Sequence, residues 1–170
     1  MIRVVTKYII QLLIIFFIQI VVLNNVTLFN SVHPYLYLIF IFMLPMNLSI
    51  SWVLLISFFI GLVIDIFSYT YGIHAMSSVL IGYIRPYLLK AFFRDESTEL
   101  LFEPHYKTLG IRNFLIYITV LTFIHHFILL IVEAFGFYDF LYTIFKITIN
   151  TVLSFIVILL YDLIAVSKKE

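Results

Sequence analysis

The chain has 170 residues, of which 64% are hydrophobic and 11% charged, whereas soluble domains are about 45–50% apolar and about 25% charged. The net charge of +1 provides no basic surface for nucleic acid, and the lack of cysteine excludes disulfides, thiolate metal sites and cysteine nucleophiles. These values predict an integral membrane protein.

The apolar segments, taken in chain order, predict six membrane helices. A transmembrane helix needs about 20 mainly apolar residues, so six helices occupy about 120 and leave no room for a second domain. We therefore expect a single all-α, six-helix membrane domain over residues 1–170. Its helices are predicted near 4–23, 34–46, 51–67, 72–89, 112–132 and 140–166, with a cytoplasmic loop at 90–111.

The first segment has the features of a membrane anchor. Arg3 and Lys7 precede its apolar run, as they would in a signal peptide. No small-residue cleavage site follows, because the run ends at Asn24 and Asn25. This pattern predicts a signal anchor that is retained.

The second segment is the shortest, and two interpretations are open for it. Its 13 residues would rise only about 20 Å, against a hydrocarbon core of about 30 Å. It is either re-entrant, or it crosses by continuing through Pro45 toward Ser49 or where the bilayer thins.

The distribution of positive charge favours a crossing. With six crossings and a cytoplasmic N-terminus, Lys146 is the single Lys or Arg outside. Without that crossing, the basic loop 90–111 would lie outside, against the positive-inside rule. Both termini are therefore predicted to be cytoplasmic. The nine cytoplasmic residues are Arg3, Lys7, Arg85, Lys90, Arg94, Lys107, Arg112, Lys168 and Lys169.

Small and polar residues on the third and fourth helices predict a tight hairpin between them. Helical spacing places each set on one face, and small residues let helix backbones approach closely. The expected hairpin residues are Gly61, Asp65, Ser68, Gly72, His74 and Gly82. Asp65 and His74 lie at similar distances from the turn, so we expect their side chains to be joined by a hydrogen bond or one water. A structural bond is the favoured interpretation; a proton relay, a ligand site and solvent-facing side chains are the alternatives.

The other polar residues in the apolar segments predict no catalytic, cofactor or metal site. Arg85 is expected either to reach lipid phosphates or to lie at a partner interface. Glu133 and Lys146 flank the last turn, which suggests an ion pair. His125 and His126 point about 100° apart, so they cannot bind a metal as an i, i+4 pair would. Neither a zinc-protease motif nor a serine nucleophile motif, phosphate loop or carboxylate dyad occurs.

The stretch from Gly61 to Ala75, continuing to Gly82 and Tyr83, resembles the central signature of MreD, the rod shape-determining membrane protein family. That signature is a Gly-x-x-x-Asp helix end, a short Ser/Gly turn, and Gly-x-His/Arg-Ala opening the next helix. The length, the six-helix layout and the prolines around the second segment are also similar. Two residues depart from the pattern: Tyr35 replaces a residue that is often polar, and Tyr71 is bulkier than the usual turn residue.

The resemblance implies a non-enzymatic scaffold subunit of the bacterial elongation complex in the inner (cytoplasmic) membrane, acting in cell shape and lateral peptidoglycan synthesis without a cofactor. It implies MreC, MreB, RodA and the class B penicillin-binding transpeptidase as partners, in addition to membrane lipid. It also implies a fold like the substrate-binding subunits of energy-coupling-factor transporters.

Two other function classes remain as alternatives. A vitamin-binding transporter subunit of that fold would often carry an Ala-x-x-x-Ala stripe on its first helix, but Met1–Asn30 contains neither Ala nor Gly. An intramembrane hydrolase would need a nucleophile–base pair, and the sequence offers no credible one.

Overall fold

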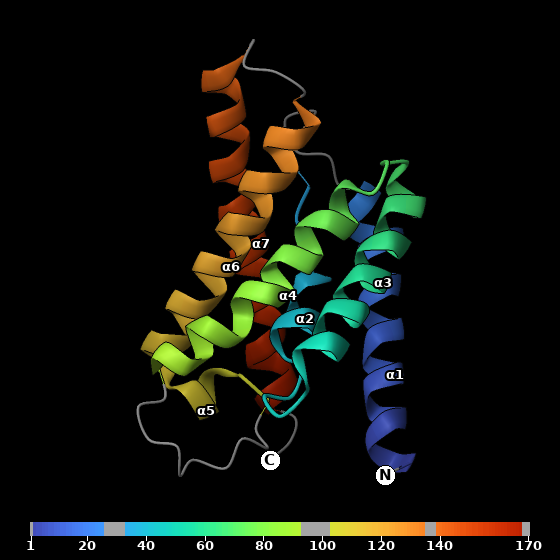
Figure 1. The fold of residues 1–170 in the computed structure, drawn as a ribbon, viewed down its shortest axis with the longest axis vertical. Helices are drawn as coiled ribbons and strands as arrows, with labels where there is room; N and C mark the ends of the chain where they lie inside the picture. The colour runs from blue at the N-terminus through green and yellow to red at the C-terminus, as the bar shows by residue number, and fades with distance from the viewer. Residues whose placement is uncertain (1, 26–32, 93–102, 135–138, 168–170) are drawn as a thin grey trace.

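The computed structural model describes residues 2–25, 33–92, 103–134 and 139–167, and in these ranges every regular element is a helix. Helix α1 continues through a π turn at Ile18–Val22 and a 3-10 turn at Leu23–Asn25. The α-helices, shown in Figure 1, are α1 (Ile2–Phe17), α2 (Leu38–Phe42), α3 (Ile50–Ser68), α4 (Ile73–Phe92), α5 (Tyr106–Leu109), α6 (Ile111–Glu133) and α7 (Phe140–Ser167).

The described part of the chain is all-helical, and its long apolar helices are those of a membrane protein. Four described segments are long and apolar enough to cross a bilayer: Thr6–Asn25, Ile50–Ser68, Ile111–Glu133 and Phe140–Ala165. Helix α4 has 20 residues but is more polar, because it contains His74, Arg85 and Lys90. The predicted helices at 51–67, 72–89, 112–132 and 140–166 correspond closely to α3, α4, α6 and α7.

The long helices run between two ends of the molecule. Helix α1 begins and α7 ends at the same end, where α5 also lies, and the turn between α3 and α4 lies at the other (Figure 1). We call these the α5 end and the turn end. The α3–α4 pair makes the most extensive helix contact, and α6 packs against both α4 and α7.

The predicted helix at 34–46 is wrong in its extent, because the helical part, α2, has five residues. The preceding residues are non-helical, and turns follow α2 before α3 begins. Pro45 explains the second limit, because it disfavours helical geometry in the residue before it.

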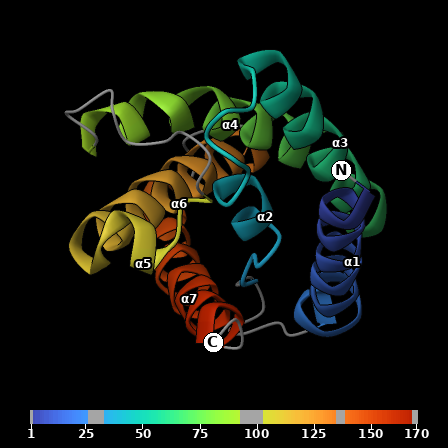
Figure 2. The same ribbon diagram turned by 90° about the horizontal axis from the view of Figure 1, so that it is seen from below.

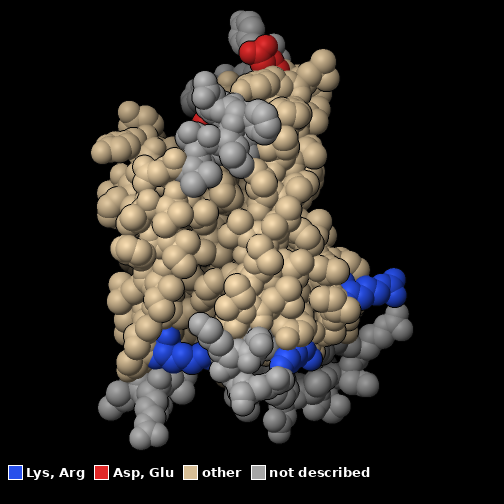
Figure 3. Space-filling model, turned by 180° about the vertical axis from the view of Figure 1, so that it is seen from behind, with Lys and Arg blue, Asp and Glu red and all other residues tan. Residues whose placement is uncertain are grey.

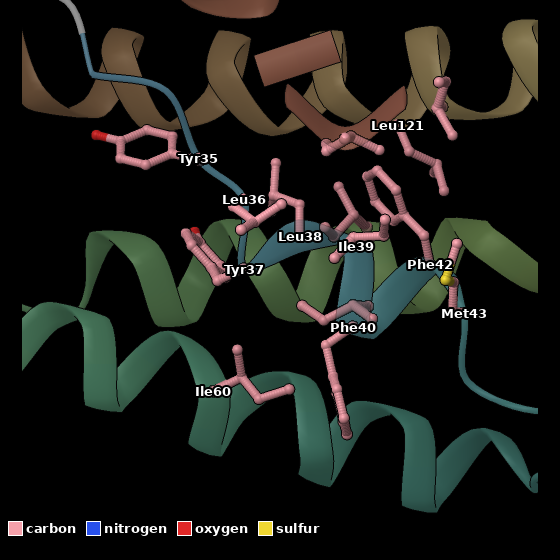
Figure 4. Packing of buried hydrophobic residues seen from close by; sticks show 14 of the residues in the cluster. Tyr35, Leu36, Tyr37, Leu38, Ile39, Phe40, Phe42, Met43, Ile60 and Leu121 are labelled. Carbon is pink, nitrogen blue, oxygen red and sulfur yellow. The ribbon is translucent and has the colours of Figure 1, made fainter. Parts of the chain in front are cut away.

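Despite its short helix, the second segment forms the centre of the core. Every residue from Tyr35 to Leu44 is buried, and their side chains fill the space between the surrounding helices (Figure 4). The expected loop at 90–111 begins later than predicted, because α4 extends to Phe92. It contains α5, and its residues 93–102 lie outside the described part of the chain.

Candidate functional site

The Asp65 carboxylate joins the end of α3 to the start of α4. One oxygen accepts the His74 backbone N–H at 3.0 Å, and the other accepts the Ala75 N–H at 2.9 Å. The Thr70 hydroxyl donates to the same carboxylate at 2.5 Å. The negative charge therefore lies at the N-terminus of α4, where free N–H groups and the helix dipole favour it.

The His74 side chain completes this connection. Its Nδ1 lies 3.1 Å from Asp65 Oδ1, within the hydrogen-bonding distance that the sequence predicts. Both side chains are at least 97% buried. The Thr70 hydroxyl also lies 3.0 Å from Nδ1, whereas Nε2 is buried without a hydrogen-bond partner. The Thr70 hydroxyl and the Asp65 carboxylate therefore both lie at the same ring nitrogen, Nδ1. In a catalytic triad, by contrast, the nucleophile and the acid bond to opposite nitrogens of the histidine ring.

The turn between the two helices accommodates its bulky residues by exposing them. The backbone has positive φ at Tyr69 (56°) and at Gly72 (84°), and glycine adopts such values without strain. The side chains of Tyr69 and Tyr71 are 91% and 100% exposed. Tyr71, the departure from the MreD pattern, therefore does not prevent the turn from forming.

Gly61 and Gly82 occupy the contact between α3 and α4. A Cβ on Gly61 would lie 2.4 Å from the Ala75 Cα and 2.6 Å from the His74 carbonyl oxygen. A Cβ on Gly82 would lie 2.6 Å from the Ser57 hydroxyl oxygen. Ser68 has a different contact, because its hydroxyl accepts a hydrogen bond from Asn24 at 3.3 Å. Four hairpin residues thus hold α3 to α4: Gly61, Asp65, His74 and Gly82. Gly72 shapes the turn, and Ser68 links the hairpin to the first segment.

A second set of polar side chains supports the non-helical entry into the core. Gln19 Oε1 accepts the backbone N–H groups of Leu36 (2.7 Å) and Tyr37 (3.3 Å). From α7, Ser154 accepts the Tyr35 N–H at 2.8 Å. Non-helical backbone at membrane depth is tolerated only where the protein satisfies its polar groups. Sequence reasoning missed these residues, although a glutamine or serine inside an apolar span is the signal that could identify them.

Arg85 has a role that the sequence did not suggest. Its side chain is 2% exposed; Nε donates to the Phe42 carbonyl oxygen at 3.2 Å, and Nη2 donates to the Leu44 carbonyl. The Tyr117 hydroxyl donates to the same Phe42 oxygen at 2.9 Å. Arg85 therefore caps the C-terminal end of α2 inside the protein. Neither a partner interface nor snorkelling fits this position, because the guanidinium is turned away from the surface.

The adjacent histidines belong to the buried polar core. His125 Nε2 lies 2.7 Å from the Tyr37 hydroxyl. His126 Nδ1 lies 2.8 Å from the Thr122 carbonyl, and its Nε2 lies 3.3 Å from the Ser154 hydroxyl. Because a carbonyl only accepts, Nδ1 carries the proton and Nε2 accepts from the serine. Within the described ranges, no group of three His, Cys, Asp or Glu side chains could hold a metal ion.

The ion pair predicted between Glu133 and Lys146 is absent. Both residues line a hollow of about 230 Å³, but the ion pairs among the described residues are Lys7–Glu103 and His74–Asp65. The Lys146 ammonium lies 5.8 Å from the centre of the Tyr142 ring instead. Exposed charges gain little from pairing, so the turn does not need this bond.

A hollow of about 270 Å³ lies beside the α3–α4 turn. Asn24, Ser68, Thr70 and His74 contribute to its partly polar lining. His33 also lines it; partial burial lowers the pKa of this imidazole, and the nearby Glu133 carboxylate opposes that shift.

Comparison of the chain with protein-family models, with curated proteins and with solved structures finds no match. Function is therefore inferred from the hairpin, the polar core and the sequence motif that they contain.

Proposed function

We propose that this chain is an MreD-like, non-enzymatic scaffold subunit of the bacterial elongation complex, acting in cell shape and lateral peptidoglycan synthesis. The observation that carries the proposal is that the motif resembling MreD forms the contact between α3 and α4. Gly61, Asp65, His74 and Ala75 all take part in one contact between α3 and α4. These four residues of the motif therefore serve one structural purpose, which is to hold the two helices together.

The proposed topology has six crossings of the cytoplasmic membrane, with residues 34–49 as the second. In support, the α5 end contains both the start of α1 and the end of α7 (Figure 1). On the face drawn in Figure 3, Lys and Arg lie toward the α5 end of the molecule and Asp and Glu lie at the opposite end. By the positive-inside rule, we propose that the α5 end and both termini lie in the cytoplasm.

A scaffold role is consistent with how the polar groups are used. The buried carboxylate, guanidinium and His126 imidazole all bond to groups of the same chain. By contrast, the outer faces of α3, α6 and α7 expose large apolar residues such as Phe59, Phe123 and Leu160. These faces offer area for lipid and for the helices of MreC and RodA, while the α5 end could contact MreB; the transpeptidase is the fourth expected partner.

A small-molecule carrier is the second candidate, and the hollow beside the turn favours it. Its volume of about 270 Å³ is slightly below the usual range for ligand pockets, about 300–1,000 Å³. Its polar lining could bind a small polar molecule such as a vitamin. We rank this function below the scaffold because the first segment lacks the Ala-x-x-x-Ala stripe.

Depletion of the protein in its native host tests the proposal. Rod-shaped cells should become round, and expression of the wild-type chain should restore their shape. The Gly61→Ala variant should restore it poorly, whereas Gly82→Ala should restore it better. Normal shape after depletion, together with vitamin binding at nanomolar affinity by the purified chain, would replace the scaffold with the carrier.

A further inference from the structure

Helix α1 is held less closely than the other membrane helices. In the span Thr6–Asn25, 11% of the residues in the most apolar stretch are buried, whereas the corresponding share in the other three spans is 33–44%. Its fully buried residues are Ile15 and Gln19. Near the α5 end, Lys7 and Tyr8 bond to Glu103. Seen from below, α1 lies at the edge of the bundle beside α3 (Figure 2).

A continuous apolar groove separates α1 from α3. It consists of two hollows of about 380 Å³ each, and Leu12 and Ile56 line both of them. We call this feature the α1–α3 groove. Further lining side chains are Tyr8, Phe16, Phe40 and Trp52.

The chemistry of the groove favours an acyl chain over a partner helix. Helix contacts in membranes depend on small residues that let two backbones approach closely. No Gly, Ala, Ser or Thr lines the groove, and its walls are leucine, isoleucine and aromatic side chains together with Pro45 and Val63. A flexible hydrocarbon chain can fill such an irregular space and needs no hydrogen bonds.

The groove also has polar neighbours suited to a lipid headgroup. The Lys7 ammonium pairs with Glu103 and lies 5.1 Å from the centre of the Tyr8 ring. Its side chain is still 42% exposed, and an ammonium has three N–H donors, so a phosphate oxygen can bind it beside Glu103. Trp52, in the first turn of α3, is 58% exposed. Ammonium groups attract lipid phosphates, and indole rings concentrate at the membrane interface.

We propose that one phospholipid of the bilayer leaflet at the α5 end binds in the α1–α3 groove. Its acyl chain lies between Leu12 and Ile56, and its phosphate lies beside Lys7. The lipid fills the space between α1 and the rest of the bundle. This inference requires the membrane location but not the scaffold function.

Trp52 allows a direct test because it is the only tryptophan in the chain. The full-length protein is reconstituted with phospholipid brominated on its acyl chains, extracted in mild detergent and freed of unbound lipid. Bromine quenches indole fluorescence on contact, so a lipid retained in the groove keeps Trp52 quenched. Native mass spectrometry of the same sample counts the retained phospholipid.

Leu12→Phe is the variant that fills the groove, and Leu13→Phe is its matched control, because Leu13 is 61% exposed and does not line the groove. Leu12→Phe should lower phospholipid affinity about tenfold, equivalent to about 1.4 kcal/mol, and Leu13→Phe should leave it unchanged. Ile56→Phe repeats the test from the opposite wall, should Leu12→Phe fail to fold.

Three outcomes would overturn the proposal. The first is unquenched Trp52 in the wild-type protein, and the second is equal lipid loss in the groove variants and Leu13→Phe. The third is a protein partner that copurifies with the wild type and is lost in Leu12→Phe, which would assign the groove to a helix.

Discussion

Replacing Gly61 with alanine tests the contact between α3 and α4. Alanine in place of glycine inside a helix normally stabilises it by about 1 kcal/mol. Here the new Cβ would lie 2.4 Å from the Ala75 Cα and 2.6 Å from the His74 carbonyl oxygen. Both obstacles are backbone atoms, which no side-chain rotation can remove. We therefore take the upper part of the overpacking range, about 3 kcal/mol, which leaves a net loss of about 2 kcal/mol.

The loss should be visible in thermal unfolding of the purified protein in mild detergent. At about 2–4 °C for each kcal/mol in a chain of this size, Gly61→Ala should lower the Tm by about 4–8 °C. Gly82→Ala is the matched control. Its Cβ meets the Ser57 hydroxyl, 2.6 Å away, which can rotate or be removed. The decrease should therefore be smaller in Gly82→Ala, and Ser57→Ala should reverse part of it. A Tm for Gly61→Ala equal to or above that of the wild type would refute the close contact.

Three further predictions concern the hydrogen bonds and the topology. Asp65→Ala should lower the Tm more than Asp65→Asn, because alanine leaves the N–H groups of His74 and Ala75 without acceptors, at about 1–3 kcal/mol each; equal Tm values would mean that water replaces the carboxylate. Tyr117→Phe should lower the free energy of unfolding by about 1 kcal/mol, because its hydroxyl donates to one carbonyl. Arg85→Gln should lower it clearly more, because the guanidinium donates to two carbonyls. The reverse order in thermal unfolding would contradict the capping of α2. A reporter that is active only in the cytoplasm should work when fused after Phe102 and fail when fused after Tyr71; activity at both sites or at neither would contradict the six crossings.

Helical spacing was sufficient to predict much of the hairpin. Small and polar residues at intervals of three and four placed Gly61 and Asp65 on one face, and the structure brings that face against α4. The bond between Asp65 and His74 followed from their positions around the turn. Both inferences depend on residues close in sequence, where helix geometry limits the arrangements.

The second segment could not be predicted in the same way. Its hydrophobicity is that of a buried helix, but five residues are helical because Gln19, Asn150 and Ser154 satisfy its backbone from other elements. Arg85 was misjudged for a similar reason, since the carbonyl oxygens that it binds lie more than 40 residues away in sequence. Such distant partners leave no periodic pattern in the chain.

Affinity purification of the wild-type chain from native membranes, in mild detergent and followed by mass spectrometry, tests the scaffold function most directly. MreC, MreB, RodA and the class B penicillin-binding transpeptidase should be enriched over a purification from cells without the tagged chain. Gly61→Ala should recover less of them, and Leu13→Phe should recover as much as the wild type. Enrichment of a transporter's ATPase core, with none of the four elongation proteins, would contradict the scaffold function.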